Sequence, residues 1–577
     1  MPAFPRANLR DLVEGAERFV RAVPGLAASL GRPVPEPMTE RFIEGTSVLA
    51  ATVLDKTEDL QRYAFELLAD RAAPWLRRPI PAASVMAFEP AREGRVVVAS
   101  TTILPSVPID GVVCSFRPIR DVVLHPLRVE ETSIEARPGG ATVVRIRIVS
   151  TGKDSLNTAL AEGVPLYVDG SLETALLTVF ALTSNVTRAA VEVPEWASPI
   201  SIDPRTILRA ELGPESALAP DPDGRPEAFG AFVEAAVFPD KFRFLRLPGL
   251  AASLLAPPAR SAVFSFELGE GGLGDARLRP GDVRAHCAPV VNLFEASAEP
   301  LPLDVERGEV PLRVVGLPRR GGGVYAVKGA AITARRGEHS PLALPDMRRL
   351  AAAAVDPRCP AVFATSVVEI DGREPDVTVA FGRRAGADAD DAVERVVSMT
   401  VLATNRHLAS RVRTGDIAGT LATGQGAVAY RNVVPGTTYV PPPTGESFSL
   451  RALRHARVTQ GKQGALASLK DMLFQSVPSW AGREEWVRAQ FLRIHALEGL
   501  EVSVARRVAP DGGVRRGHAY RLRVDESAFR GAGELGLFGA TVGEALSRSS
   551  PVGTFVELTL VGRRGTFEAV FPTEGRP

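Results

Sequence analysis

Three glycines in the middle of the chain have the clearest potential for chemistry. Gly269, Gly271 and Gly274 match the G-x-G-x-x-G spacing of a dinucleotide-binding loop, and residues 263–268 before them could form the required strand. The loop also needs a helix whose N-terminus faces the pyrophosphate, and Pro280 follows Gly274 too closely to leave room for one. We therefore predict a glycine-rich surface turn here and no bound cofactor.

A second candidate, a phosphate loop, fails at two positions that its chemistry requires. Gly461 and Lys462 resemble the end of the motif, but Ala456 stands where the first glycine is needed. Gln463 replaces the Ser or Thr whose hydroxyl would hold magnesium. This segment is not expected to bind a nucleotide.

Histidine and cysteine also form no recognisable site. The seven histidines show no metal-ligand spacing, and Cys114, Cys287 and Cys359 match no metal or redox motif. His286 is adjacent to Cys287, but neighbouring residues of a strand face opposite sides and cannot form a nucleophile–base pair. We predict no catalytic residue and no metal site.

Six phenylalanines lie close together and could either stack on bases or sugars or fill a core. Only Lys241, Arg243 and Arg246 accompany them, which is too little positive charge for a nucleic-acid platform. We predict core packing and no binding of nucleic acid. The six residues are Phe229, Phe232, Phe238, Phe242, Phe244 and Phe264.

The composition is that of a globular protein without a strongly charged partner. Among 577 residues, 68 are basic and 67 are acidic, which gives a net charge of +1. Three scattered cysteines favour a reducing compartment over a disulfide framework. The N-terminus lacks an apolar signal segment, and no run approaches the ~18 apolar residues of a membrane span. We expect a cytoplasmic protein that does not insert into a membrane.

The length predicts several domains, because a single core rarely grows beyond ~250–300 residues. We expect a multidomain α+β fold, with a helical segment over residues 1–82 and a small α+β domain over 444–577. Between them we expect two β-rich, sandwich-like domains over residues 83–285 and 286–443. The prolines at 441–443 are the best candidate for a linker.

Helical periodicity occurs in two stretches of the first segment. One covers residues 9–23, and a longer one runs from about residue 39 to 73 with Phe42 and Leu49 on its apolar side. Two interpretations remain open: the apolar side docks a partner, or it covers the chain's own core.

Strand patterns begin at Ser84. Residues 144–148 alternate apolar side chains with arginine, which is typical of a strand with one solvated face, and Ser171 can cap a following helix. The last segment predicts two helices, a hairpin that turns at residues 511–513, a helix near 537–546 and a final strand near 556–560.

One apolar stretch lies where the two β-rich segments meet. Residues 288–295 read APVVNLFE and suit a buried strand, so Asn292 in their midst needs a hydrogen-bond partner. We expect a structural joint in which backbone groups satisfy Asn292.

A series of short motifs follows a fixed order along the chain. It comprises ERFIEG at 40–45, RPIP at 78–81, FPDKF at 238–242, APVVNLFE at 288–295 and TNR at 404–406. Together these motifs resemble the TssF family, baseplate subunits of bacterial type VI secretion systems. The residues that carry the resemblance are Arg41, Phe42, Glu44, Gly45, Arg78, Pro79, Pro81, Phe238, Pro239, Lys241, Phe242, Pro289, Val290, Asn292, Leu293, Phe294, Glu295, Asn405 and Arg406.

The resemblance implies structural work without an enzyme activity or a cofactor. Two copies of such a chain would join TssG, with TssE and TssK, into wedges around a VgrG spike hub that supports the sheath and tube. The assembly would dock at the cytoplasmic side of an inner-membrane complex. Two alternatives remain open: a subunit of a divergent contractile injection system, or a cytoplasmic enzyme or carbohydrate-binding protein built on β-sandwiches.

Overall fold

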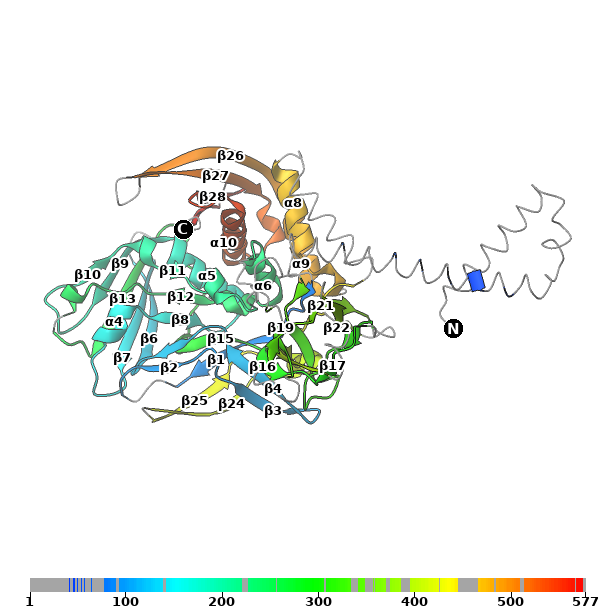
Figure 1. Ribbon diagram of the computed structural model, residues 1–577. Coiled ribbons are helices and arrows are strands. Elements are labelled where there is room, and N and C mark those ends of the chain that lie inside the picture. Colours follow the sequence, from blue (N-terminus) through cyan, green and yellow to red (C-terminus); the bar gives the residue numbers. More distant parts are fainter. Residues whose placement is uncertain are drawn as a thin grey trace, which may run out of the picture. The chain divides into compact units, whose positions relative to one another are not determined.

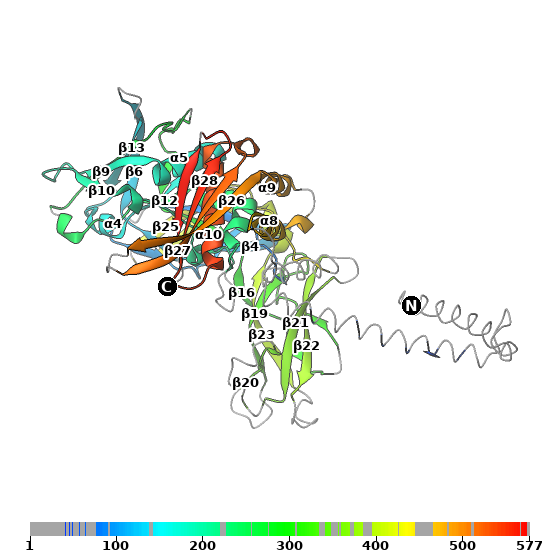
Figure 2. The same ribbon diagram turned by 90° about the horizontal axis from the view of Figure 1, so that it is seen from above.

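The chain forms two compact units, one made of residues 1–74 and 448–456 and the other of the remaining residues. All named strands belong to the second unit (Figures 1 and 2). The computed structural model describes residues 77–89, 93–137, 142–219, 227–255, 257–274, 276–305, 308–333, 341–347, 356, 359–369, 374–384, 395–424, 426–444, 465–481, 484–508, 513–565 and 567–573, with single helical positions between 41 and 64. The helix predicted over residues 9–23 lies outside this set.

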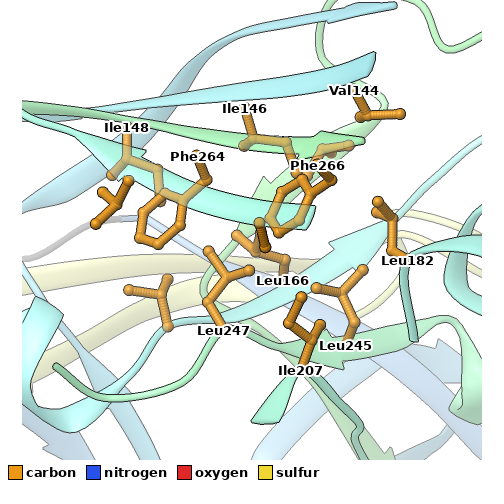
Figure 3. Close-up of a cluster of buried hydrophobic side chains, with 14 of the residues drawn as sticks. Val144, Ile146, Ile148, Leu166, Leu182, Ile207, Leu245, Leu247, Phe264 and Phe266 are labelled. Atoms are coloured by element: carbon orange, nitrogen blue, oxygen red, sulfur yellow. The ribbon is translucent and has the colours of Figure 1, made fainter. Parts of the chain in front are cut away.

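A β-sandwich occupies the first part of the second unit. Strand β7 alternates as predicted, and its buried Val144, Ile146 and Ile148 meet Phe264 and Leu166 from other strands (Figure 3). Side chains from two facing sheets therefore share one core. The described strands follow the orders β10-β9-β13-β7-β6 and β11-β12-β8-β14. They are β6 (Leu127–Ala136), β7 (Thr142–Ser150), β8 (Pro165–Val168), β9 (Val186–Glu192), β10 (Ile200–Ile202), β11 (Leu208–Arg209), β12 (Phe244–Arg246), β13 (Ser261–Leu268) and β14 (Val283–Ala285).

Three of the described helices lie between strands of this sandwich in the sequence. Ser171 caps α5 by accepting a hydrogen bond from the Thr174 amide at 3.2 Å, which confirms the cap predicted from the sequence. The glycine-rich stretch after β13 forms turns, and residues 276–282 contain no helix, as predicted. The helices are α4 (Asn157–Glu162), α5 (Leu172–Ser184) and α6 (Gly230–Val237).

A central antiparallel sheet joins strands that are far apart in the sequence. In the described chain its order is β24-β25-β1-β15-β4-β3, so β1 lies between β15 and β25. The segments 83–285 and 286–443 therefore share this sheet, and their separation into two domains stays a hypothesis. The strands are β1 (Ala83–Phe88), β3 (Leu104–Ile109), β4 (Val112–Pro118), β15 (Cys287–Val291), β24 (Ala418–Thr423) and β25 (Gly426–Asn432), with β2 (Val96–Val98) and β5 (Val122–Leu124) forming a separate ribbon.

A second sandwich is built from residues 294–404. Phe294, Met399 and Val401 from one sheet share a core with Phe363 and Phe381 from the other. Strands β16, β23, β19 and β20 follow one another in the first sheet, β17 pairs with β23, and β18-β22-β21 form the second. The bounds are β16 (Phe294–Ser297), β17 (Leu301–Pro302), β18 (Val310–Pro311), β19 (Gly323–Ile332), β20 (Leu342–Ala343), β21 (Ala361–Val368), β22 (Asp376–Arg383) and β23 (Val396–Thr404).

The C-terminal sheet has the order β26-β27-β28-β29, with β27 and β28 parallel and connected by α10. The predicted hairpin is confirmed as β26 and β27. The expected final strand, β28, is followed by β29. The elements are α8 (Ala465–Ser476), α9 (Glu485–His495), β26 (Leu497–Val508), β27 (Val514–Val524), α10 (Ala532–Ser549), β28 (Phe555–Gly562) and β29 (Glu568–Thr573).

Glycines allow α10 to approach its neighbours closely. A side chain at Gly536 would overlap the ring of Phe180 on α5, and one at Gly539 would overlap the ring of Phe571 on β29. The ring of Phe232 on α6 also meets Phe538 at 6.0 Å between ring centroids. The C-terminal sheet thus shares its core with helices of the preceding segments, and the predicted α+β class is confirmed.

Candidate functional site

The APVVNLFE and TNR motifs meet at a fully buried pair of asparagines, which we call the asparagine junction. Asn292 lies between β15 and β16, and Asn405 lies directly after β23. The Asn292 amide nitrogen donates to the Ser115 carbonyl oxygen and to Asn405 Oδ1, both at 2.8 Å. Its Oδ1 accepts from the Thr404 hydroxyl at 2.8 Å and from the Asn405 backbone N–H at 2.7 Å.

Asn405 extends this network to further elements. Its Oδ1 accepts from the Ser115 backbone N–H at 3.0 Å, and its amide nitrogen donates to the Gly321 carbonyl at 2.9 Å. The junction therefore ties β4, β15, β23 and the approach to β19 together through side chains whose polar groups have partners. The predicted joint is confirmed, although Asn292 is satisfied by side chains as well as by backbone groups. Such a network fixes geometry and offers no group for chemistry.

Arg406 continues the junction as a buried ion pair. Its backbone has a φ of 51°, and its guanidinium pairs with Asp376 on β22, which also binds Arg319 at 2.9 Å. Gly323 permits this approach, because a Cβ there would lie 2.5 Å from Arg406 Nε. A buried pair of this kind is costly to break, since removing one partner leaves an uncompensated charge.

A carboxylate and a histidine lie beside this ion pair. His407 pairs with Glu374, and the hydrogen bond from His407 is the main cause that lowers the pKa of the Glu374 carboxyl. Burial raises the pKa of the neighbouring Tyr439 hydroxyl above its usual range. Arg406 and Glu374 also lie 3.7 Å apart. The charges of these side chains compensate one another.

The FPDKF motif forms a second buried polar pair. Lys241 is 1% exposed and pairs with Glu234 of α6, whose other oxygen accepts from the Leu218 backbone N–H at 2.7 Å. Phe238 packs in one core with Val291 and Leu293, so this motif contacts the APVVNLFE stretch.

The other end of the motif reaches the C-terminal part. Phe242 packs in one cluster with Leu176 of α5 and Leu537 of α10. All six clustered phenylalanines are at most 6% exposed. The core interpretation is confirmed, and the interpretation as a stacking platform is wrong.

The remaining motif residues lie at several places. Arg41 and Gly45 are exposed at helical positions of the first unit, whereas Phe42 and Glu44 lie outside the described residues. Arg78 stacks over the Tyr325 ring at 5.9 Å. The other positions are Pro79 and Pro81, both buried beside the Ile80–Val440 bridge; Pro239, which begins the short helix 239–242; Pro289 and Val290, buried in β15; and Phe294 and Glu295, at the start of β16.

Sequence patterns did not indicate the partners of these motif residues. Glu234 precedes Lys241 by seven residues, a helical spacing that could have indicated the pair. Asp376 and Ser115 have no such signal, because they lie 30 residues from Arg406 and 177 residues from Asn292.

A cavity of about 290 Å³ beside His125 is the nearest approach to a catalytic arrangement. His125 Nε2 lies 3.3 Å from Glu162, and burial lowers the pKa of this histidine. Ser155 and Thr158 line the same cavity, but within the described chain neither hydroxyl forms a hydrogen bond with His125. A base without a hydrogen-bonded nucleophile does not form a catalytic pair.

The prediction for His286 and Cys287 assumed that both lie in one strand, and His286 lies outside it. His286 lies between β14 and β15 with a φ of 58°, and its Nε2 accepts from the His125 backbone N–H at 3.2 Å. Burial raises the pKa of the Cys287 thiol to about 12, which leaves it protonated and unreactive at neutral pH. Within the described residues no group of three His, Cys, Asp or Glu side chains could hold a metal.

A larger cavity of about 460 Å³ lies among α5, α6, α9 and α10. Phe232, Leu537 and Phe538 line it, together with Arg493, which pairs with Glu534. These lining residues form no reactive constellation.

Comparison with known proteins shows the family to which this chain belongs. A family model for "Type VI secretion system, TssF" matches residues 5–575. The chain belongs to the TssF family. This confirms the resemblance that the motifs indicated. The search of curated proteins finds no match.

Two solved structures share the TssF-family fold of this chain. A chain of the type VI secretion system TssK-TssF-TssG baseplate subcomplex, determined by cryo-electron microscopy, aligns with a TM-score of 0.74 at 20% identity, covering 93% of this chain and 99% of that one. A chain of the baseplate complex from the type VI secretion system aligns with a TM-score of 0.58 at 21% identity, covering 99% and 98%. No helix in the described part of this TssF-family chain is long and apolar enough to cross a membrane.

Proposed function

We propose that this TssF-family chain is a structural, non-catalytic subunit of a type VI secretion baseplate, where it forms wedges with TssG and TssK. The observation that carries the proposal is the family match over residues 5–575. The similar chain in the TssK-TssF-TssG subcomplex supports it through the shared fold. The proposal extends to a second copy of the chain, to TssE and to the VgrG hub, with the assembly on the cytoplasmic side of the membrane complex.

The interior suits a subunit that must keep its shape under mechanical load. The asparagine junction and the Arg406–Asp376 pair connect the second sandwich to the central sheet through buried hydrogen bonds. Buried, satisfied polar networks specify one arrangement of the elements they join. A wedge that transmits movement between neighbours benefits from such rigid joints.

The first unit offers a candidate contact surface. Leu49 and Val53 are 68% and 65% exposed, and they lie four residues apart on one side of a helix. Of the two interpretations of this apolar side, we favour the one in which a partner covers it.

Co-expression with TssG and TssK from the same genome tests the proposal. We expect a stable complex with more than one copy of the chain, measured by native mass spectrometry. A wild-type chain that remains a monomer and binds neither protein would refute the function.

A paired substitution then tests the helix surface. L49E/V53E should abolish the complex and leave the circular dichroism spectrum unchanged, because both side chains are exposed. The matched control L208E/V315E alters two other exposed apolar residues, 57% and 53% exposed, and should keep the complex. If L49E/V53E forms the complex as well as L208E/V315E does, this side of the helix is not the contact surface.

A further inference from the structure

The hairpin of β26 and β27 extends beyond the sheet to which it belongs (Figures 1 and 2). β28 pairs with β27 only from Gly517 onward, whereas β26 and β27 pair as far as Val508 and Val514. Residues 506–508 and 514–516 therefore form a two-stranded projection, which we call the arginine arm. A two-stranded ribbon without a covered face has little stability of its own.

The register of the arginine arm places like charges opposite each other. Arg506 pairs with Arg516 and Arg507 with Arg515, and only the Val508–Val514 pair at the end is uncharged. Opposed like charges destabilise an antiparallel pair. The stability of the isolated chain therefore does not explain this arrangement.

Among the described residues, only one of these four arginines has a compensating charge. Arg507 lies 3.3 Å from Glu557, and its guanidinium stacks 4.6 Å from the centre of the Phe555 ring. Arg506, Arg515 and Arg516 are exposed, and none of them has an ion pair with another described residue. Their positive charge is available to a second molecule.

Exposed valines accompany this charge. Val504, Val508 and Val514 are 71%, 72% and 65% exposed, and the alternation of a strand puts Val504 and Val508 on the same face as Arg506. The arm thus combines an exposed apolar strip with arginine, a residue that is enriched at protein interfaces.

We propose that the arginine arm docks on a protein partner whose surface carries carboxylates around an apolar patch. The arm contains no aromatic residue for stacking on bases, and the residues between its strands, 509–512, read APDG and offer no large apolar side chain for a membrane. A second copy cannot pair arm to arm, because the same arginines would repel. The inference rests on the proposed function, since the partner would be another protein of the same assembly.

Charge reversal in the full-length chain tests this surface. R506E/R516E is compared with R188E/R205E, which makes the same charge change at two exposed arginines that form no ion pair with a described residue. Affinities for purified TssG and TssK are measured by biolayer interferometry at 50 and 300 mM NaCl. We expect R506E/R516E to weaken binding to one protein at least tenfold at low salt, with the control within twofold of wild type. Wild-type binding should also weaken at high salt, and the complex should protect the amides of 505–508 from hydrogen exchange.

The outcomes separate the two proposals. If R506E/R516E has the affinity and the hydrogen exchange of the wild type, the docking role of the arginine arm is refuted and the proposed function stays intact. A wild-type chain that binds neither protein would overturn both. Arm-dependent binding to a 20-nucleotide single-stranded DNA, or to phosphatidylserine vesicles, with no effect on protein binding would also overturn the assignment of a protein partner.

Discussion

Replacement of Asn292 by alanine tests whether the asparagine junction holds the fold together. The substitution removes the partner of two buried backbone groups, the Ser115 carbonyl and the Asn405 N–H. Asn405 Oδ1 keeps a bond from the Ser115 N–H, and Thr404 Oγ1 keeps one from the Arg406 N–H. Each orphaned buried group costs about 1–3 kcal/mol, so we expect a loss of about 4 kcal/mol in the free energy of unfolding.

The expected change in melting temperature follows from the size of the unit. An entropy of unfolding of ~2.1 cal/mol/K per residue gives ~1 kcal/mol/K for about 500 residues that unfold together. Asn292→Ala should therefore lower the melting temperature by about 4 °C in differential scanning calorimetry. Smaller cooperative segments would increase the shift.

The control is the same substitution at a less buried asparagine. Asn185 is half-buried and its side chain donates one bond, to the Glu270 carbonyl at 3.2 Å, so Asn185→Ala should cost less than about 1 kcal/mol. Asn292→Asp adds a pH test, because its buried carboxylate would face the Ser115 carbonyl and its pKa would be raised. The destabilisation relative to wild type should decrease from pH 7.5 to 5. If Asn292→Ala melts within 1 °C of Asn185→Ala, the hydrogen bonds of the asparagine junction do not stabilise the fold.

Three further predictions concern buried ionisable groups. Lys241→Met should lower the free energy of unfolding by about 3 kcal/mol in urea titrations by leaving Glu234 uncompensated, and adding Glu234→Gln should recover most of the loss. Because burial raises its thiol pKa, Cys287 should react with a disulfide reagent at pH 8 only in denaturant, and rapid native labelling would contradict this. Burial, and then the charge of a neighbouring histidine, lowers the pKa of His286 to about 3. As the pH falls, the imidazole therefore takes up its proton in the unfolded chain before it does so in the folded chain. The free energy of unfolding should decrease below pH ~6.5, by up to ~1.4 kcal/mol per pH unit. His286→Asn should remove that part of the acid sensitivity, and an unchanged pH profile would show that His286 titrates normally.

Local features of the fold could be predicted from the sequence. The alternation in β7, the cap at Ser171 and the turn of the β26–β27 hairpin depend on neighbouring residues, whose periodicity and turn chemistry are visible in the chain itself. The absence of a helix from residues 276–282 could likewise be predicted from Pro280.

The sequence alone determined the β-rich class, the positions of the local elements and the family to which the motifs point. Only the tertiary structure decided that β1 lies between β15 and β25, that Asn292 meets Asn405, and that Arg406 meets Asp376. The physical reason is that a buried polar group must find a partner, and which partner it finds depends on how distant strands are brought together. Hydrophobic periodicity specifies which face of a strand is buried, but it carries no information about the strand on the other side.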